Sequence, residues 1–355
     1  MKLTLWCVRA VGAVVLVAGS LVAQQSAPTE TRSLDCVAAA EHSRENSGLA
    51  VLVFERGELV FEEYQNGHRA EKPQHLFSGA KSFVPVVALV AEAEGLLTLD
   101  EVGAETLTEW KGDKHREKIT VRHLLNFTSG LEHADRALHS MQVEDKYEHA
   151  VACEGVHEPG RRFRYGSNHG MAFGELFQRK LDAAREQDDS VPADFVDYLK
   201  QRVLDPIDCE VTGWIRDARG HPAMSYGALM TAREWAKFGQ LLLARGRHGD
   251  AQIIPTEHFD QMFEGSRVNP IYGLNFWLRG PILHRREAAI PDDVVAAAGM
   301  YDQRLFVSPS RQIVVVRLGR TGARRSSYDD FKFLKLLFTS PPSASRPSSR
   351  PSTDR

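Results

Sequence analysis

A serine and a lysine stand three residues apart directly before a long apolar run. The tetrad Ser78-Gly79-Ala80-Lys81 follows the apolar pair Leu76-Phe77, and the run Phe83–Ala93 predicts a buried helix that ends at Gly95. Residues three apart on a helix lie on the same face, so the hydroxyl and the amine of the tetrad can meet. In the first turn, the backbone N–H of the serine also faces an incoming anion, which the helix dipole favours.

This arrangement is that of a serine nucleophile beside a lysine that can accept its proton. No other serine of the chain has a lysine at the third following position. Taken alone, the pattern also fits a helix N-cap followed by a surface lysine, so the rest of the sequence has to decide. Pro85 lies inside the predicted helix, and we expect either a kink there or a helix that begins later.

The composition is that of an ordinary globular protein. Of the 355 residues, 43% are hydrophobic and 26% are charged, which suffices for a large core. The formal net charge is -3 and the basic residues are scattered along the chain. The sequence therefore gives no electrostatic indication that the protein binds nucleic acid.

Residues 1–23 predict a signal peptide. Lys2 and Arg9 precede the apolar stretch Ala10–Ala23, whose length suits a secretory segment and is too short to span a bilayer. Cleavage after Ala23 would yield a secreted or periplasmic protein without stable membrane insertion, and an uncleaved anchor is the alternative. Residues 339–355 consist largely of serine, proline and arginine, and we expect them to be disordered.

No metal or cofactor site is predicted. The 14 histidines and the cysteines form neither a Cys-x-x-Cys nor a His-Glu-x-x-His pattern. Cys36, Cys153 and Cys209 remain after signal cleavage, and three thiols form at most one disulfide, whose pairing stays open.

Apolar runs of strand length lie near both ends of the domain, with a mostly helical middle between them. They are residues 50–54, 59–64, 304–307 and 313–318, and a final amphipathic helix follows around 331–338. We therefore expect one domain, residues 34–338, whose sheet is completed by both ends of the chain. Its α/β lobe would comprise about 34–95 and 295–338, with a helical lobe of about 96–290 inserted between.

A second candidate group is Tyr165, which stands where a loop leads into a helix. The turn residues Pro159-Gly160 precede it, and the small polar residues Ser167 and Asn168 follow before an apolar stretch from Met171. A tyrosine at such a corner can aim its hydroxyl into a cleft. Taken alone, however, a tyrosine that anchors the loop is the simpler interpretation.

In their order along the chain, these segments resemble the serine β-lactamase-like hydrolase family. This family comprises class C β-lactamases, D-alanyl-D-alanine carboxypeptidases, related esterases and 6-aminohexanoate-dimer hydrolases, and the resemblance spans about residues 52–338. The segments that carry it are Phe77–Lys81, Ile119–Leu125, Thr128–Leu131, the Tyr165 segment, Thr231–Gly239, Phe306–Pro309 and Val314–Gly319. The resemblance implies an α+β fold of the β-lactamase/transpeptidase type, in which helices flank an antiparallel sheet and a mainly helical lobe is inserted.

The resemblance also implies roles for three side chains. Ser78 would attack a carbonyl carbon and become acylated, Lys81 would hold or take its proton, and Tyr165 would pass that proton to the leaving group and then activate water. To act at neutral pH, the lysine and tyrosine pKa values must each fall by roughly 3 units. A cation favours the phenolate and burial disfavours the ammonium, so both shifts can arise together.

Two motifs depart from the family pattern. The family usually has Tyr-x-Asn, whereas Ser167 stands at that position here and Asn168 follows, so either is a candidate for binding a substrate amide. The third motif, a His or Lys, any residue and a Gly, is best matched by Met300-Tyr301-Asp302-Gln303. In this alignment, the N–H of Gln303 joins that of Ser78 as an oxyanion donor, a contact worth roughly 3 kcal/mol in comparable sites.

In the same alignment, Asp302 replaces the glycine. A carboxylate there opposes a developing oxyanion and a substrate carboxylate alike, unless the side chain turns away from the cleft. This argues against penicillin and peptidoglycan-stem substrates, and it leaves an ester or an uncharged or cationic amide as the expected small-molecule partner.

The favoured hypothesis is a secreted serine hydrolase of the esterase and 6-aminohexanoate-dimer hydrolase branch. Gly213–Asp217 and Gly299–Gln303 resemble that branch more than the β-lactamases. One alternative is a non-catalytic binding or sensor protein on the same fold, with Asp302 closing the oxyanion site. Another is a penicillin-binding protein that is acylated without turnover. The natural substrate and the oligomeric state stay open.

Overall fold

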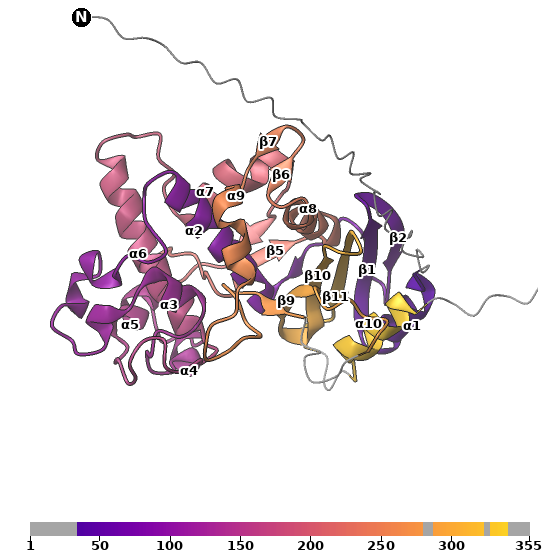
Figure 1. Cartoon of the computed structure of the whole chain (residues 1–355), viewed down its shortest axis with the longest axis horizontal. Helices are drawn as coiled ribbons and strands as arrows, with labels where there is room; N and C mark the ends of the chain where they lie inside the picture. Colours follow the sequence, from indigo (N-terminus) through magenta and orange to yellow (C-terminus); the bar gives the residue numbers. More distant parts are fainter. Residues whose placement is uncertain (1–33, 280–286, 323–326, 340–355) are drawn as a thin grey trace, which may run out of the picture. The chain divides into compact units, whose positions relative to one another are not determined.

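The computed structural model describes residues 34–279, 287–322 and 327–339, so the predicted signal peptide and most of the predicted tail lie outside the described residues. Its largest sheet has six strands in the order β2-β1-β11-β10-β9-β8, paired antiparallel (Figure 1). The strands are β1 (Gly48–Glu55), β2 (Glu58–Tyr64), β8 (Trp277–Leu278), β9 (Val295–Gly299), β10 (Gln303–Ser308) and β11 (Ile313–Gly319). The predicted antiparallel sheet with helices on its faces is confirmed.

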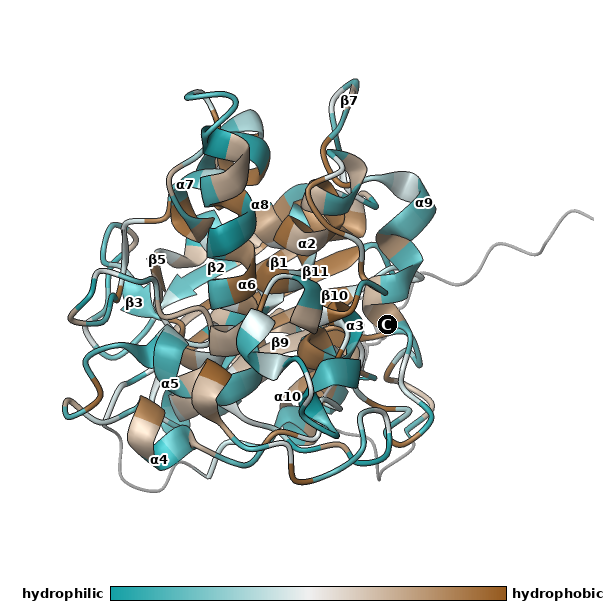
Figure 2. Ribbon diagram, turned by 90° about the vertical axis from the view of Figure 1, so that its left-hand side faces the viewer, coloured by the Kyte–Doolittle hydropathy of each residue, from teal (hydrophilic) through white to brown (hydrophobic). Residues whose placement is uncertain are grey.

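Helices cover both faces of this sheet. One face packs against α8 (Ala232–Leu243), and the other packs against α1 (Cys36–Glu45) and α10 (Asp330–Phe338). The central strands β1 and β11 are consequently buried along most of their length, as near-continuous apolar sequences require. Figure 2 shows these strands in brown, with helices of mixed teal and brown around them.

Threonine side chains cap the starts of two helices. The Thr231 side chain accepts a hydrogen bond from the N–H of Glu234 at the start of α8, which buries Trp235 and Phe238 against the sheet. Thr120 caps α3 (Val121–Leu125) in the same way. The remaining α-helices are α2 (Phe83–Ala93), α4 (Asp135–Leu138), α5 (Lys146–Ala152), α6 (Ser167–Arg185), α7 (Phe195–Leu199) and α9 (Thr256–Phe259).

The remaining strands of the described residues form two smaller sheets. One has the order β3-β5-β4, and the other pairs β6 with β7. Their bounds are β3 (Gln74–His75), β4 (Gly213–Trp214), β5 (Ala228–Met230), β6 (Arg247–His248) and β7 (Ala251–Gln252). The pairing of β3 with β5 places the segment before Ser78 beside the segment that follows Ser225.

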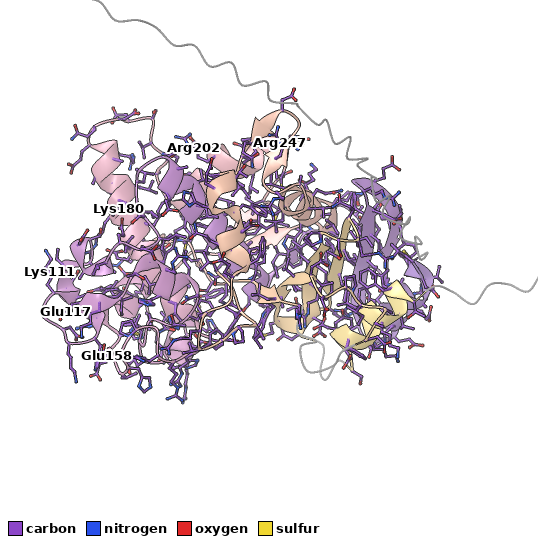
Figure 3. The ribbon with its side chains drawn as sticks, in the orientation of Figure 1. Lys111, Glu117, Glu158, Lys180, Arg202 and Arg247 are labelled. Carbon is purple, nitrogen blue, oxygen red and sulfur yellow. The ribbon has the colours of Figure 1, made fainter. Side chains whose placement is uncertain are left out.

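Charged side chains of both signs point outward over the helical part of the molecule. Lys111, Glu117 and Arg247 are exposed examples (Figure 3). In the described part of the chain, no helix has both the length and the apolar character that a membrane span requires. Cys36, Cys153 and Cys209 are all free thiols.

Candidate active site

Ser78 and Lys81 lie on a 3₁₀ turn, η1 (Phe77–Ser82), that continues directly into α2. Pro85 is the third residue of α2, where its missing N–H would have no partner within the helix, so the later helix start is confirmed. In a 3₁₀ turn, side chains at i and i+3 eclipse each other. The Nζ atom of Lys81 accordingly lies 3.3 Å from the Oγ atom of Ser78.

The Lys81 amine is almost completely buried, with an exposed fraction of 3%. Besides Ser78, it donates a hydrogen bond to the carbonyl oxygen of Ser225 at 2.8 Å. Burial lowers the pKa of Lys81 to about 7, although the nearby negative charge of Asp135 opposes this shift. A large fraction of the amine is therefore neutral near pH 7 and can accept a proton.

Tyr165 lies next to the amine. Lys81 Nζ is 5.1 Å from the centroid of the Tyr165 ring. The ring packs against Phe127 and Trp277, with centroid distances of 5.2 and 5.9 Å. Burial raises the pKa of Tyr165 to about 12, and the interaction of the phenol with Ser78 only partly offsets this effect.

The sequence analysis expects a fall in pKa for both Lys81 and Tyr165. This fall occurs for Lys81, but the pKa of Tyr165 is raised instead. The reason is that burial penalises the charged form of each group, which is the ammonium for lysine and the phenolate for tyrosine. At neutral pH, the lysine of this pair can therefore accept a proton, and the tyrosine can donate one.

Ser167 and Asn168 hold the corner from which Tyr165 projects. Both side chains are buried at the start of α6. Ser167 Oγ lies 3.0 Å from Nε2 of His139, and Asn168 Nδ2 donates to the carbonyl oxygen of Glu132 at 2.8 Å. The Oδ1 atom of Asn168 is buried without a hydrogen-bond partner. The binding of a substrate amide by either residue stays a prediction.

The third motif lies three residues earlier than the sequence alignment placed it. The strand that packs on η1 is β9, and Gly299 is its last residue. A Cβ atom at this position would lie 2.0 Å from the carbonyl oxygen of Leu76, so only glycine allows the strand to approach the nucleophile turn this closely. Ala297-Ala298-Gly299 thus occupies the motif position, with alanine in place of the usual histidine or lysine.

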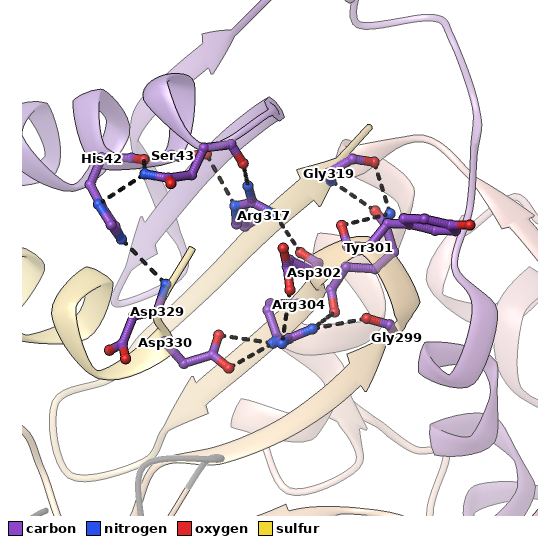
Figure 4. A network of polar contacts seen from close by, with 12 residues as sticks. His42, Ser43, Gly299, Tyr301, Asp302, Arg304, Arg317, Gly319, Asp329 and Asp330 are labelled. Atoms are coloured by element: carbon purple, nitrogen blue, oxygen red, sulfur yellow. Dashed lines mark hydrogen bonds and ion pairs between the residues drawn. The ribbon is translucent and has the colours of Figure 1, made fainter. Parts of the chain in front are cut away.

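Asp302 and Gln303 consequently have different surroundings from those expected. The Asp302 carboxylate lies 3.5 Å from Arg304 Nη2, in the network of Figure 4. Gln303 is the first residue of β10 and pairs with Gly299, while its side chain donates to the carbonyl oxygen of Gly319 at 2.8 Å. The first N–H beyond Gly299 is that of Met300, which makes Met300 the candidate for the second oxyanion donor in place of Gln303.

The chain matches one family model over most of its length. The model is that of the Beta-lactamase family, and the match covers residues 34–332. The chain belongs to the Beta-lactamase family. Homologues in this family are serine hydrolases, so a buried Ser-Lys pair with a tyrosine beside it has the setting that such chemistry uses. No curated protein matches the chain.

Solved structures show the same fold at low sequence identity. A D-stereospecific amidohydrolase from Streptomyces has a TM-score of 0.62 at 16% identity, with 85% of this chain and 98% of that chain covered. EstCE1, a hydrolase with promiscuous acyltransferase activity, has a TM-score of 0.61 at 18% identity, covering 80% and 93%. The octameric penicillin-binding protein homologue from Pyrococcus abyssi has a TM-score of 0.62 at 17% identity, covering 83% and 74%.

Asp135 is a site residue that sequence reasoning missed. Its Oδ1 atom accepts the N–H of Ser167 at 2.5 Å and so caps α6, whose N-cap residue is Gly166 and has no side chain for this purpose. Its charge also acts on the pKa values of both Lys81 and Tyr165. The glycine N-cap is the one sequence signal for such a partner, because it leaves the helix start without a local acceptor.

Among the described residues, one group has the atoms to hold a metal ion, namely Asp145, Asp217 and His221. The carboxylates already accept backbone N–H groups, at 2.8 Å from Glu148 to Asp145 and at 2.9 Å from His221 to Asp217. These bonds explain the cluster as a support for the start of α5 and the loop after β4. A cavity of about 760 Å³ lies near Val295 and Val307, at the end of β9 and β10 opposite to Gly299.

Substituting Gly299 tests whether activity depends on the close approach of β9 to η1. We expect Gly299→Ala to lower kcat roughly 100-fold, since the new Cβ would displace β9 or η1 by about 1 Å. Gly213→Ala is the matched control, because a Cβ there meets no atom within 4 Å. Steady-state kinetics of a folded Gly299→Ala protein with the wild-type kcat would contradict this placement.

Proposed function

We propose that this member of the Beta-lactamase family is a serine hydrolase that cleaves an ester or amide through an acyl-enzyme on Ser78. The observation that carries the proposal is the buried amine of Lys81, 3.3 Å from Ser78 Oγ and with a pKa of about 7. A lysine that only stabilised the fold would keep its amine in water and its pKa near the ordinary value.

The proposed reaction begins with the transfer of the Ser78 proton to neutral Lys81. The serine oxygen attacks the carbonyl carbon, and the bond to the leaving group breaks as Tyr165 donates its phenolic proton to that group. The resulting phenolate is next to the ammonium of Lys81, 5.1 Å from the ring centroid, and takes a proton back from it. Water then attacks the acyl-enzyme, and the same two groups carry its proton to Ser78.

Two backbone N–H groups are proposed to bind the oxyanion, those of Ser78 and Met300. In the described part of the chain, neither donates to a backbone or side-chain acceptor. Each is therefore available to a ligand, and one such donor is worth roughly 3 kcal/mol in the transition state.

The surroundings favour a substrate whose acyl part carries no negative charge. β9, with the sequence Val295–Gly299, presents no histidine or lysine, and Asp135 adds a negative charge near Lys81. Aromatic rings lie next to the proposed catalytic groups: Tyr165 stacks with Trp277, and Phe77, the residue before Ser78, packs edge-on against Tyr301 at 5.2 Å. We infer an apolar, uncharged ester or amide as the substrate class. Secretion and the cleavage of residues 1–23 stay predictions.

Among the described residues, the contact of Asp302 argues against the alternative of a non-catalytic protein. That alternative required the carboxylate of Asp302 in the oxyanion site, whereas this carboxylate lies toward Arg304. Ser78, Lys81 and Tyr165 are close together, as acyl transfer requires.

The pH dependence of kcat/KM tests the proposed base. Activity should rise with pH through about 7, because protonated Lys81 cannot accept the serine proton, and stay level to pH 10, because the pKa of Tyr165 is about 12. Asp135→Asn should move the rise to lower pH, since the Asp135 charge raises the pKa of Lys81. Asp260→Asn, an exposed carboxylate paired with Arg245, is the control. A rise above pH 9 in the wild type would exclude Lys81 as the neutral base.

A further inference from the structure

The turn between β9 and β10 has an unfavourable backbone conformation. Tyr301 and Asp302 both have left-handed φ angles, 58° and 61°, although neither is glycine. Consecutive left-handed residues with side chains persist only where their surroundings enforce them, and such positions gather at functional sites. This turn begins with Met300, the proposed second oxyanion donor, and the Tyr301 ring rests on Phe77 beside the nucleophile.

Three side chains donate to three of the carbonyl oxygens around this turn, those of Gly299, Tyr301 and Asp302 (Figure 4). Arg304 Nη1 donates to the carbonyl of Gly299 at 2.9 Å, and Arg317 Nη1 donates to the carbonyl of Asp302 at 2.7 Å. Gln303 Nε2 makes a longer contact of 3.4 Å with the carbonyl of Tyr301. Both ends of the turn are therefore bound by arginine, and charge-assisted bonds of this kind are stronger than bonds between neutral groups.

Arg317 has a position in β11 that stability alone does not explain. Its exposed fraction is 0%, and its hydrogen-bond acceptors are neutral: Ser43 Oγ at 3.2 Å and the carbonyl of Asn46 at 2.7 Å, besides that of Asp302. The guanidinium also lies 4.0 Å from the centroid of the Tyr328 ring. An apolar side chain of similar volume at a buried ionic position is often as stabilising or more so.

Arg304 is fixed in a different way. Its Nε atom donates to both carboxylate oxygens of Asp330, at 2.8 and 3.0 Å, and this carboxylate belongs to the first residue of α10. Its Nη1 atom is thereby directed at the Gly299 carbonyl, next to the peptide that carries the N–H of Met300. The Gly299 carbonyl and the Met300 N–H belong to the same planar peptide unit, so holding one fixes the direction of the other.

We propose that Arg304 and Arg317 are positioning residues that lock the turn Gly299–Gln303 and thereby aim the N–H of Met300 at the developing oxyanion. Neither arginine touches the substrate in this account. The proposal rests on the proposed function, because the aim of an N–H at an oxyanion matters only if Ser78 forms a tetrahedral intermediate.

The test uses Arg317→Met and Arg317→Lys in the full chain, with p-nitrophenyl butyrate as substrate. Arg317→Met should lower kcat about 10- to 100-fold with KM changed less than about threefold, because the lost aim affects the transition state and not substrate binding. Arg317→Lys should recover part of kcat, since an ammonium can reach the Asp302 carbonyl. The midpoint of the pH profile should stay where it is, because neither arginine is among the charges that shift the pKa of Lys81. Arg245→Met, at an exposed ion pair with Asp260, is the control.

A double substitution distinguishes locking of the turn from general loosening of the core. Glycine adopts the left-handed conformation without strain and keeps the carbonyl that Arg317 binds, so Asp302→Gly should make the turn less dependent on the arginine. In the Asp302→Gly background, Arg317→Met should therefore cost at least threefold less in kcat than in the wild type. An equal cost in both backgrounds overturns the proposal.

If Arg317→Met fails to fold, as judged by its circular dichroism melt, Arg304→Met carries the same test at the other end of the turn. A folded variant of either arginine with unchanged kcat, or with a change in KM alone, overturns the proposal. Ser78→Ala, measured in parallel, distinguishes a failure of the proposed function from a failure of the positioning roles. Turnover that survives in Ser78→Ala refutes the proposed function, whereas its loss with unaffected arginine variants refutes only the positioning roles.

Discussion

Ser78→Ala is expected to abolish turnover of p-nitrophenyl acetate and p-nitrophenyl butyrate, with a loss of roughly three orders of magnitude or more. The hydroxyl is the only group of the proposed site that forms a bond to the substrate, so no residual acyl transfer should pass through the neighbouring amine. Labelling by a fluorophosphonate probe should disappear in the same variant. Nitrocefin should stay intact even with the wild type, because β9 offers no cation for its carboxylate.

Ser82→Ala provides the matched control for this substitution. Ser82 lies on the same 3₁₀ turn, but its hydroxyl is fully buried and donates to the carbonyl oxygen of Gly79 at 2.8 Å. Its removal should cost some stability and leave fluorophosphonate labelling intact. Equal labelling of Ser78→Ala and the wild type would move the nucleophile to another residue.

Lys81→Met should have the second large effect. It should lower activity and raise the free energy of unfolding. Activity should fall about 100- to 10,000-fold, since the general base is lost. Stability should rise, because the pKa of Lys81 is about 7 in the folded state against 10.5 in the reference state. The unfolded chain therefore binds more protons between these values, and burial of Lys81 destabilises the fold most below pH 7.

The stabilisation by Lys81→Met should thus amount to several kcal/mol at pH 6 and shrink as the pH rises towards 10. Urea unfolding of the wild type and the variant at pH 6, 8 and 10 measures this difference directly. Lys180→Met is a suitable control, because this lysine forms its ion pair with Glu101 on a partly exposed face. A variant that is less stable than the wild type at pH 6 would show that the amine is not buried as described.

The part of the site that depends on local geometry could be predicted from the sequence. Ser78 and Lys81 are three residues apart on one turn, so their contact follows from the helix period alone, and the position of Pro85 limits where α2 begins. The antiparallel sheet follows from the family resemblance, while the apolar runs near both ends of the domain located four of its six strands, β1, β2, β10 and β11.

The direction of the Tyr165 pKa could not be predicted in this way. It depends on burial by Phe127 and Trp277, which come from segments far away in the sequence. The sequence shows that a phenol and an amine can meet, but the solvent that each loses on folding depends on tertiary packing.

The third motif was misplaced for a related reason. Val295–Gly299 contains three alanines and a glycine, which have weak strand propensity, so β9 leaves little trace in the sequence. Because the sequence indicates β10 more clearly, the alignment placed the motif immediately before that strand, at Asp302. In the structure, the close approach of Gly299 to Leu76 identifies the motif position, and the carboxylate of Asp302 belongs to the arginine network.

The most direct test of the acyl-enzyme is to trap it. The protein is mixed briefly with p-nitrophenyl butyrate, quenched in acid and digested, and the peptides are analysed by mass spectrometry. One butyryl group is expected on the peptide that contains Ser78, and none is expected in Ser78→Ala. A folded protein that releases p-nitrophenol while its butyryl group sits on another residue, or that releases none, would contradict this expectation.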